Sequence, residues 1–371
     1  MDPLLTRLFP IDPGLVLLNH ASFGVPTLAA LDRLDAEHRR LELDAAGRLM
    51  TSLPDGLAPV REVVAALVRA DVAQVAMVSS STEASAALAT SLPLAPGETV
   101  ALLDGEYESV LRAWQVRTER SGAHLAVLPL PVPATAASVL EAIAGAPAGT
   151  RYLVVSAITS STALRLPVPQ VVELARERGM RVVLDAAHVV GHEGLDLATA
   201  GVAAAFGSLH KWLPVPRSVG FLWVAPDLTD QVHPAAVAVR YDDPYPDRFA
   251  WRGTWDPAAT LGLPAAVTEW SAWQAAGLFD EARAVADLAD EVLIGCGWTP
   301  TGSPDLRPWR LRGFVVPGPP DTLRAVADAA QVRLWTGTAP DGRTLARVAT
   351  HIWSDGDDVA RLAEVARAAA S

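Results

Sequence analysis

Short apolar runs alternate with helical or loop segments through the middle of the chain, from about residue 98 to residue 225. The runs are TVALLD at 99–104, HLAVLPL at 124–130, YLVVSAI at 152–158, RVVLDAA at 181–187, VAAAFGS at 202–208 and VGFLWV at 219–224. Helices expected at 106–120, 136–145 and 168–179 supply three of the crossovers between them. This pattern predicts an α/β fold with a mostly parallel sheet that is covered on both faces.

The two ends of the chain have other patterns. Apolar positions at three- and four-residue spacing predict two helices between residues 24 and 70. A long helix over 264–293 precedes strands at 311–318, 332–337 and 346–353 and helices at 320–330 and 357–369. We therefore predict an N-terminal arm (1–23) that packs with a small C-terminal α+β domain (291–371), and a large domain (24–290) between them. The segment 226–262 has no clear period, and we expect an ordered excursion near the site.

Composition narrows the possible classes of protein. With 371 residues and 50% apolar composition, disorder is excluded as the main state. No apolar stretch is long enough for a membrane helix, and the N-terminus does not resemble a signal peptide. The net charge of -12 and the scattered basic residues argue against nucleic acid and anionic lipid as partners. A lone cysteine, Cys296, leaves no internal disulfide and no cysteine-rich metal site, so we expect a cytoplasmic protein.

One lysine stands out. Of the 30 basic residues, only Lys211 is a lysine, and the rest are arginines. The composition thus strongly favours arginine over lysine. Because a guanidinium cannot act as a primary amine, the one lysine that is retained suggests a chemical role. Lys211 follows one predicted strand by a short turn, and Asp185 ends the strand before it, so both fall at the edge of the sheet where ligands bind. An amine and a carboxylate placed there suit pyridoxal phosphate, although Asp185 alone could equally cap a turn or form a salt bridge.

Several motifs in order carry a family resemblance. They are LNHASFG at 18–24, SSTEA at 80–84, DGEYESVLRAW at 104–114, ITSSTALRLPV at 158–168, LDAAHVVGHEGLDL at 184–197, GSLHKWLPVPRSVGFLWV at 207–224 and WRGTWDPAA at 251–259. Together they resemble the class V aminotransferase family of fold type I pyridoxal phosphate enzymes. The resemblance is strongest to the isopenicillin N epimerase-like branch, with cysteine desulfurases and carbon–sulfur lyases as cousins.

The resemblance implies roles around the cofactor. Lys211 matches the lysine that forms the Schiff base, and Asp185 matches the partner of the ring nitrogen. His188 matches the residue that reaches the ring hydroxyl. Tyr107 falls where cysteine desulfurases stack a histidine on the ring, which is a departure from their pattern. The phosphate contacts implied by the motifs are Ser81, Thr82, Ser208 and His210, with Gly253 and Thr254 contributed by a neighbouring subunit.

The resemblance also implies a substrate site and a homodimer with shared active sites. Arg347 matches the arginine that clamps the substrate carboxylate, a task that suits a planar guanidinium. Ser160, in ITSSTALRLPV, joins the expected substrate site. Asn19 and His20, in LNHASFG, are the alternative carboxylate contacts. The expected partner is a small-molecule amino-acid substrate.

Other chemistries fit the sequence less well. His188 and His192 form an HxxxH pair that could bind zinc, but no third ligand stands at a recognisable spacing, so no metal is predicted. No GxGxxG motif follows an early strand, which argues against a nicotinamide-dependent enzyme. The single lysine does not follow GxxxxG, which argues against a P-loop enzyme. A non-catalytic regulator that senses an amine would need an added DNA-binding domain, for which the chain has neither length nor basic charge.

The sequence also orders the possible reactions. The stretch VRLWTGTAPDGRTLARV, where cysteine desulfurases carry their catalytic cysteine, has none, so persulfide chemistry is not expected. Carbon–sulfur β-elimination on a cysteine conjugate of specialised metabolism ranks first, because one base suffices. Epimerisation ranks second, and decarboxylation coupled to deamination or transamination third.

Overall fold

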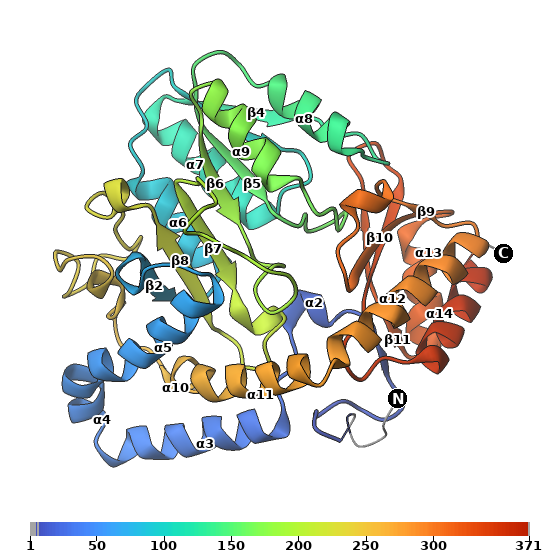
Figure 1. Cartoon of the computed structure of the whole chain (residues 1–371), viewed down its shortest axis with the longest axis horizontal. Helices are drawn as coiled ribbons and strands as arrows, with labels where there is room; N and C mark the ends of the chain where they lie inside the picture. Colours follow the sequence, from blue (N-terminus) through green and yellow to red (C-terminus); the bar gives the residue numbers. More distant parts are fainter. Residues whose placement is uncertain (1–4, 6, 370–371) are drawn as a thin grey trace.

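The computed structural model describes Leu5 and residues 7–369. Within them, a seven-stranded sheet layered between helices forms one part of the molecule, and a smaller antiparallel sheet with its own helices forms the other (Figure 1). Residues 1–4 and 6 of the predicted arm, and 370–371 of the predicted small domain, lie outside the described residues. No helix in the described part of the chain is long and apolar enough to cross a membrane.

The large sheet has the strand order β2-β8-β7-β6-β5-β3-β4. Its strands are β2 (Val75–Val78), β3 (Thr99–Leu103), β4 (His124–Leu128), β5 (Thr150–Ser156), β6 (Arg181–Asp185), β7 (Ala204–Ser208) and β8 (Gly220–Val224). All pairs are parallel except those of β8, which runs antiparallel to both neighbours. The predicted α/β class with a mostly parallel sheet is therefore confirmed.

Helices cover both faces of this sheet because its strands are apolar on both sides. In β3, Val100 and Leu102 join one buried cluster while Ala101 and Leu103 join the other. The first cluster lies under α6 (Ser81–Ser91) and α7 (Glu108–Ser121). The second lies under α5 (Leu53–Leu67), α8 (Ala136–Ala144), α9 (Val168–Glu177) and α11 (Leu263–Ala275). With both faces packed, ligands reach the sheet at its strand ends.

The smaller sheet has the order β12-β13-β10-β9. Its strands are β9 (Thr299–Pro300), β10 (Leu311–Val316), β12 (Trp335–Thr338) and β13 (Thr344–Ala349), and its helices are α12 (Leu278–Gly295), α13 (Pro320–Ala329) and α14 (Gly356–Ala369). Near the N-terminus, β1 (Val16–Leu17) pairs in parallel with β11 (Val332–Arg333). The N-terminal segment thus contacts the C-terminal part of the chain, while the predicted domain boundaries stay predictions.

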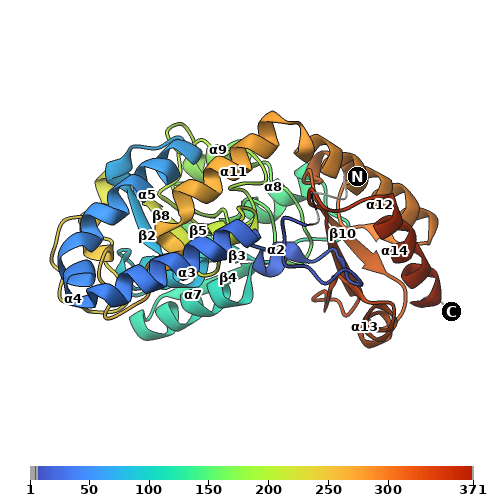
Figure 2. The same ribbon diagram turned by 90° about the horizontal axis from the view of Figure 1, so that it is seen from below.

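Three local expectations differ from the structure. The helix expected over 264–293 is two helices, α11 and α12, because Gly277 between them has a positive φ of 76°. This break lets α11 and α12 lead from the large sheet to the small one along one edge of the molecule (Figures 1 and 2). The first of the two helices expected between residues 24 and 70 spans Leu28–Leu43 and ends where Asp44 leaves helical geometry. Strand β2 was not predicted.

The remaining elements are the long helix α3 and several short helices and turns. They are α2 (His20–Phe23), α3 (Leu28–Leu43), α4 (Ala45–Gly47), the π-helical turn η1 (Arg48–Ser52), α10 (Ala258–Leu261) and the 3-10 turns η2 (Val72–Gln74), η3 (Leu209–Lys211), η4 (Pro226–Leu228), η5 (Asp247–Phe249) and η6 (Pro304–Leu306). The segment 226–262 is ordered, with two 3-10 turns and a single helical turn.

Candidate active site

A cavity of about 410 Å³ opens beside the carboxyl ends of β5, β6 and β7. Most of the residues predicted from the sequence line it, although they come from seven separate segments of the chain. The predicted residues that line it are Asn19, Ser81, Thr82, Tyr107, Ser160, Asp185, His188, Ser208, His210, Lys211 and Arg347. The cavity therefore gathers the sequence motifs at the edge where a doubly wound sheet binds its ligands.

Asp185 and Lys211 meet at the floor of this cavity. Asp185 is the last residue of β6, and Lys211 ends the 3-10 turn η3 that follows the neighbouring strand β7. Burial raises the pKa of Asp185 against the opposing attraction of Lys211. Burial likewise lowers the pKa of Lys211 to about 8, against the opposing attraction of Asp185. A substantial fraction of the amine is thus neutral just above neutral pH, as a nucleophile requires.

One wall of the cavity is suited to an anion. Ser81 opens α6, and Ser80 caps this helix by accepting a hydrogen bond from the Glu83 amide (3.3 Å). The Ser81 amide donates to Ser208 Oγ (3.1 Å), and the two serine hydroxyls lie 3.0 Å apart. Burial lowers the pKa of His210 to about 4, so it is neutral at pH 7. Hydroxyl groups at a helix N-terminus form a binding site for phosphate.

Arg347 approaches the cavity from β13 of the smaller sheet. Its guanidinium is 3% exposed, donates to the Ser160 carbonyl and to Ser22 Oγ (2.9 Å), and lies over the ring of Trp335. Ser22 in turn donates to Asn19 Oδ1 (2.6 Å). Within the described chain Arg347 has no carboxylate partner for an ion pair, and burial lowers its pKa to about 10. A buried cation without a counterion favours an anionic ligand.

Tyr107 and His188 bound the space beside Lys211. Lys211 Nζ lies 5.7 Å from the centre of the Tyr107 ring, and Tyr107 is 43% exposed at the cavity. His188 is 3% exposed, and burial holds its pKa well below the usual range. Its Nε2 atom has no hydrogen-bond partner within the described chain. A buried polar atom of this kind needs a partner, and a ligand in the cavity can supply one.

Three predicted residues do not line the cavity. His20 is buried behind it, with its ring 4.8 Å from that of Trp212. The close packing follows from Gly24, which has a φ of 68° and at which any Cβ would meet the His210 carbonyl. Thr254 is exposed and Gly253 is half-buried, in a loop that Arg252 ties to α6 through an ion pair with Glu83 (2.7 Å). Neither of these two residues lines this cavity.

Comparison with known proteins agrees with this geometry. The model of the class V aminotransferase family matches residues 31–293. The chain belongs to the class V aminotransferase family. It is 34% identical over 237 residues to isopenicillin N epimerase of Streptomyces clavuligerus, an alignment that spans 63% of this chain and 59% of that protein. It is 25% identical over 341 residues to L-cysteine desulfhydrase of Arabidopsis thaliana, spanning 86% of this chain and 74% of that protein.

Solved structures show the same fold. The cystine C–S lyase C-DES, solved with its product cysteine persulfide, superposes with a TM-score of 0.81 at 18% identity over 95% of this chain and 98% of that one. The fold is therefore that of fold type I enzymes, with a mostly parallel central sheet. As a class V aminotransferase the chain is an enzyme, and its cofactor is pyridoxal phosphate. The predicted family, fold, enzyme class and cofactor are confirmed.

The residues of the cavity fit this cofactor. Lys211 offers a half-buried amine, Asp185 a buried carboxylate, and His188 an unpartnered ring nitrogen, while the start of α6 offers hydroxyls for a phosphate. The cavity is lined by three cationic side chains, Lys211, Arg217 and Arg347, against one carboxylate, Asp185. This excess of positive charge suits a phosphate and a substrate carboxylate. Among the described residues, no group of His, Cys, Asp and Glu could hold a metal ion.

Sequence reasoning missed a buried acid beside the cavity. Glu106 is 7% exposed, and its carboxylate accepts from the Ser156 amide (2.8 Å) and lies 2.5 Å from Ser156 Oγ. Burial raises the pKa of Glu106 to about 8, with a smaller contribution from Asp185. Ser156 lines the cavity and stands opposite Asp185 in the sheet. The signal for Glu106 was its place just before Tyr107, but its burial could not be inferred from one sequence.

The raised pKa of Glu106 predicts a pH dependence of stability. Between the ordinary pKa of glutamate and about 8, the folded protein keeps a proton that the unfolded chain releases, so rising pH favours unfolding over this window. Glu106→Gln retains both contacts with Ser156 and removes the titration. We expect a gain of a few kcal/mol over wild type near pH 8, at about 1.4 kcal/mol per pKa unit. Urea unfolding of the cofactor-free protein near pH 5 and near pH 8 measures it.

Glu177→Gln, which changes an exposed glutamate at the end of α9, is the matched control for this experiment. It should follow the wild-type curve at both pH values. Equal pH dependence in Glu106→Gln and wild type would contradict a protonated Glu106.

Proposed function

We propose that this enzyme catalyses carbon–sulfur β-elimination on a cysteine conjugate. The observation that carries the proposal is that the cavity holds one amine base, Lys211, with its pKa lowered to about 8. One base suffices for this reaction: a proton leaves the α-carbon, the bond between the β-carbon and sulfur breaks, and the thiolate departs with the electron pair. The remaining 2-aminoacrylate takes up water to give pyruvate and ammonia.

Each side chain has a distinct task in this proposal. The bound cofactor supplies an electron sink for the α-carbon. Asp185 keeps the ring nitrogen of that cofactor protonated, and Lys211 removes the α-proton on the side where it lies. Arg347 binds the substrate carboxylate, supported by Ser22 and Asn19. Tyr107, whose ring centre lies 5.7 Å from Lys211 Nζ, would contact the ring of the cofactor.

The chain offers no cysteine for a persulfide route. Cys296 follows the end of α12 and packs against the apolar cluster of the small sheet. A desulfurase reaction would need a thiol at the cavity to accept sulfur. The names of the desulfhydrase relative and of the C–S lyase neighbour support an elimination. We place the substrate in specialised metabolism and the enzyme in the cytoplasm.

Amino-acid epimerisation is the second candidate, favoured by the 34% identity to an isopenicillin N epimerase. It would require a proton to return to the α-carbon from the face opposite Lys211. Tyr107 is the side chain that lies opposite Lys211 and would have to deliver that proton. A phenol is a poor proton carrier near neutral pH. Decarboxylation coupled to deamination or transamination ranks third.

The test of the proposed reaction measures products. We expect S-substituted cysteines to yield pyruvate and free thiol in equal amounts, and Lys211→Ala, which removes the only lysine, to yield neither. Lys211→Ala should also lack the yellow colour of the lysine-bound cofactor. The wild-type enzyme would instead be an epimerase if it forms neither pyruvate nor thiol, while the amino acid loses its chirality and takes up deuterium at the α-carbon in heavy water.

Replacing Arg347 tests the carboxylate site. Arg347→Lys keeps the charge but loses the planar pair of donors, so we expect substrate binding to weaken by about 1.5 to 3 kcal/mol, the size of one charged hydrogen bond. Titration of the cofactor spectrum with an amino acid measures it. Arg333→Lys, at an arginine paired with Asp328 on the surface, is the control. An unchanged affinity in Arg347→Lys would move the carboxylate to another residue.

We propose that the active enzyme is a homodimer in which each subunit supplies Gly253 and Thr254 to the phosphate of the other. Thr254 is exposed. The Arg252–Glu83 ion pair anchors its loop beside helix α6, whose first residues form the proposed phosphate site of the same subunit. Apolar side chains are also exposed, with Leu43, Met50 and Val239 at 84%, 64% and 85%. An exposed apolar surface of this kind suits contact with a second copy.

Mixing two inactive variants tests the shared site. Lys211→Ala and a phosphate-binding variant, Thr254→Val, should each be inactive alone. Mixed dimers should regain part of the activity, because one of their two sites then has both a native lysine and a native threonine. Failure of mixing to restore activity, or an active monomer in light scattering at assay concentration, would contradict the proposal.

A further inference from the structure

Four histidines and an arginine are buried together behind Lys211. His20, His188, His192 and His351 are each at most 4% exposed, and Arg310 is 1% exposed. Burial holds the pKa of all four imidazoles well below the usual range. The histidines are therefore neutral, and each carries its proton on one of two ring nitrogens. The nitrogen that carries the proton donates a hydrogen bond, and the other nitrogen accepts one.

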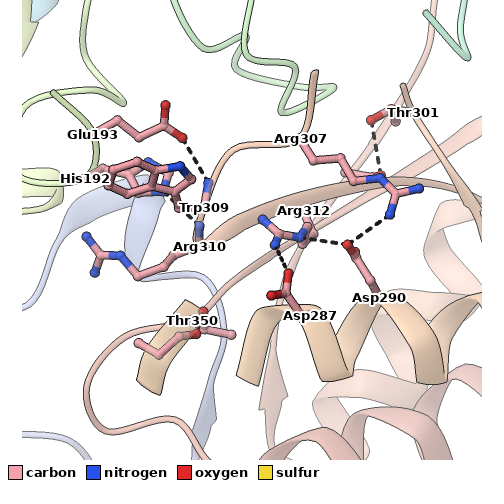
Figure 3. A network of polar contacts seen from close by, with 12 residues as sticks. His192, Glu193, Asp287, Asp290, Thr301, Arg307, Trp309, Arg310, Arg312 and Thr350 are labelled. Carbon is pink, nitrogen blue, oxygen red and sulfur yellow. Dashed lines mark hydrogen bonds and ion pairs between the residues drawn. The ribbon is translucent and has the colours of Figure 1, made fainter. Parts of the chain in front are cut away.

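Two hydrogen bonds fix the proton of His192. Its Nε2 accepts from the Arg310 amide (2.9 Å), as Figure 3 shows, so this nitrogen carries no proton. The proton is therefore on Nδ1, which donates to the His188 carbonyl (3.0 Å). His192 thus links the backbone at His188 to the backbone at Arg310, which directly precedes strand β10 of the smaller sheet. Glu193 adds a second tie by accepting from the Trp309 amide (2.9 Å).

Trp212 is held rigidly between His192 and Arg310. Its ring stacks on His192, with ring centres 3.9 Å apart and planes 13° from parallel. The Arg310 guanidinium lies 5.1 Å from the Trp212 ring and 4.3 Å from the Phe279 ring, and donates to the Gly191 carbonyl (2.9 Å). A cation between two aromatic faces is stabilised by both. Trp212 is thus fixed in place directly after Lys211 in the sequence.

This orientation decides the state of His188. The indole nitrogen of Trp212 can only donate, and it points at His188 Nδ1 across 3.4 Å. A proton on Nδ1 would face the indole proton, so a neutral His188 must carry its proton on Nε2. Nε2 is the atom that has no partner in the described chain, and His188 lines the cavity. The charged groups that act on His188 are Lys211 and Arg347, and both oppose a second proton on it.

We propose that Trp212 and His192 are positioning residues that keep His188 neutral with its proton on Nε2, as a donor to the ring oxygen of the cofactor. The inference rests on the proposed contact between His188 and that oxygen, and it holds for elimination and epimerisation alike. Trp212 acts through its N–H group, and His192 acts by fixing both the indole plane and the His188 backbone. Arg310 extends the support to the smaller sheet, whose strand β13 carries Arg347.

The first measurement needs no cofactor. In the cofactor-free protein labelled with ¹⁵N-histidine, NMR distinguishes the two neutral ring forms, and the His188→Gln spectrum assigns the His188 signal. We expect His188 to be in the Nε2–H form. Finding its proton on Nδ1, or finding a doubly protonated ring near pH 7, overturns the proposal whatever any variant does.

The second measurement uses the holoenzyme. Trp212→Phe keeps an aromatic ring for stacking but removes the N–H donor, so His188 is free to exchange its proton between nitrogens. We expect the pH midpoint of the lysine-bound cofactor absorbance to move by about half a unit or more, the effect of changing one hydrogen bond. Trp298→Phe, which removes a buried indole from the apolar cluster of the smaller sheet, should leave the midpoint where it is.

His188→Phe separates the proposal from the contact on which it rests. If His188→Phe moves the midpoint but Trp212→Phe does not, His188 contacts the cofactor without help from Trp212, and the proposal is overturned while the proposed function stands. If neither variant moves the pH midpoint, the proposed contact of His188 with the ring oxygen is contradicted as well. A shift in both variants, with none in Trp298→Phe, supports the proposal.

Discussion

Asp185 is buried at the end of β6 and Lys211 is half-buried in the turn that follows β7, where desolvation works against both charges at once. Their attraction offsets part of this cost, but burial still raises the pKa of the acid and lowers that of the amine. Parallel packing of β6 against β7 keeps the pair together. The cavity also contains Arg217 and Arg347, so positive charge exceeds negative charge there. Anionic groups on the cofactor and the substrate neutralise this excess, so the pair and its surroundings favour ligands with a phosphate and a carboxylate.

The end of the cavity around Arg347 is assembled from segments far apart in the sequence. Arg347 comes from the smaller sheet, yet it donates to the Ser160 carbonyl of the large part and to Ser22 Oγ of the N-terminal segment. Its Nε–H has no partner among the described residues. Gly24 allows that segment to lie against the backbone at His210, and β1 secures it to β11. The geometry around Arg347 therefore depends on how the two sheets are held together. The Arg310–His192 contact belongs to the same junction (Figure 3).

Much of the fold followed from the sequence because its signals are local. Each of the six apolar runs between 98 and 225 contains a strand, and Lys211 was distinguished by composition alone. Strand β2 was missed because Val75–Val78 forms a short run whose pairing is with β8, a strand far along the chain. The break at Gly277 was missed because one glycine is tolerated in many helices.

The sequence predicted the residues of the site only where they belong to motifs of the family. Residues whose roles depend on three-dimensional neighbours were not found from the sequence. Glu106 is an ordinary acid until Ser156 and burial surround it, and Trp212 is one of eleven tryptophans until it stacks on His192. His20 shows the opposite failure, because its motif lies at the cavity while its side chain turns away toward Trp212. Motifs locate segments, whereas side-chain direction follows from packing.

The residues that hold the cofactor do not select the reaction, since elimination and epimerisation share the same first proton transfer. They differ in what happens to the electrons left at the α-carbon. A sulfur substituent removes them with the departing thiolate, so a site with one base is complete. Epimerisation instead requires a proton from the opposite face, where Tyr107 is 43% exposed and Phe23, at the same cavity, is 68% exposed. Tyr107 is the side chain that would have to donate this proton, so the acidity of one phenol separates the two reactions at this cavity.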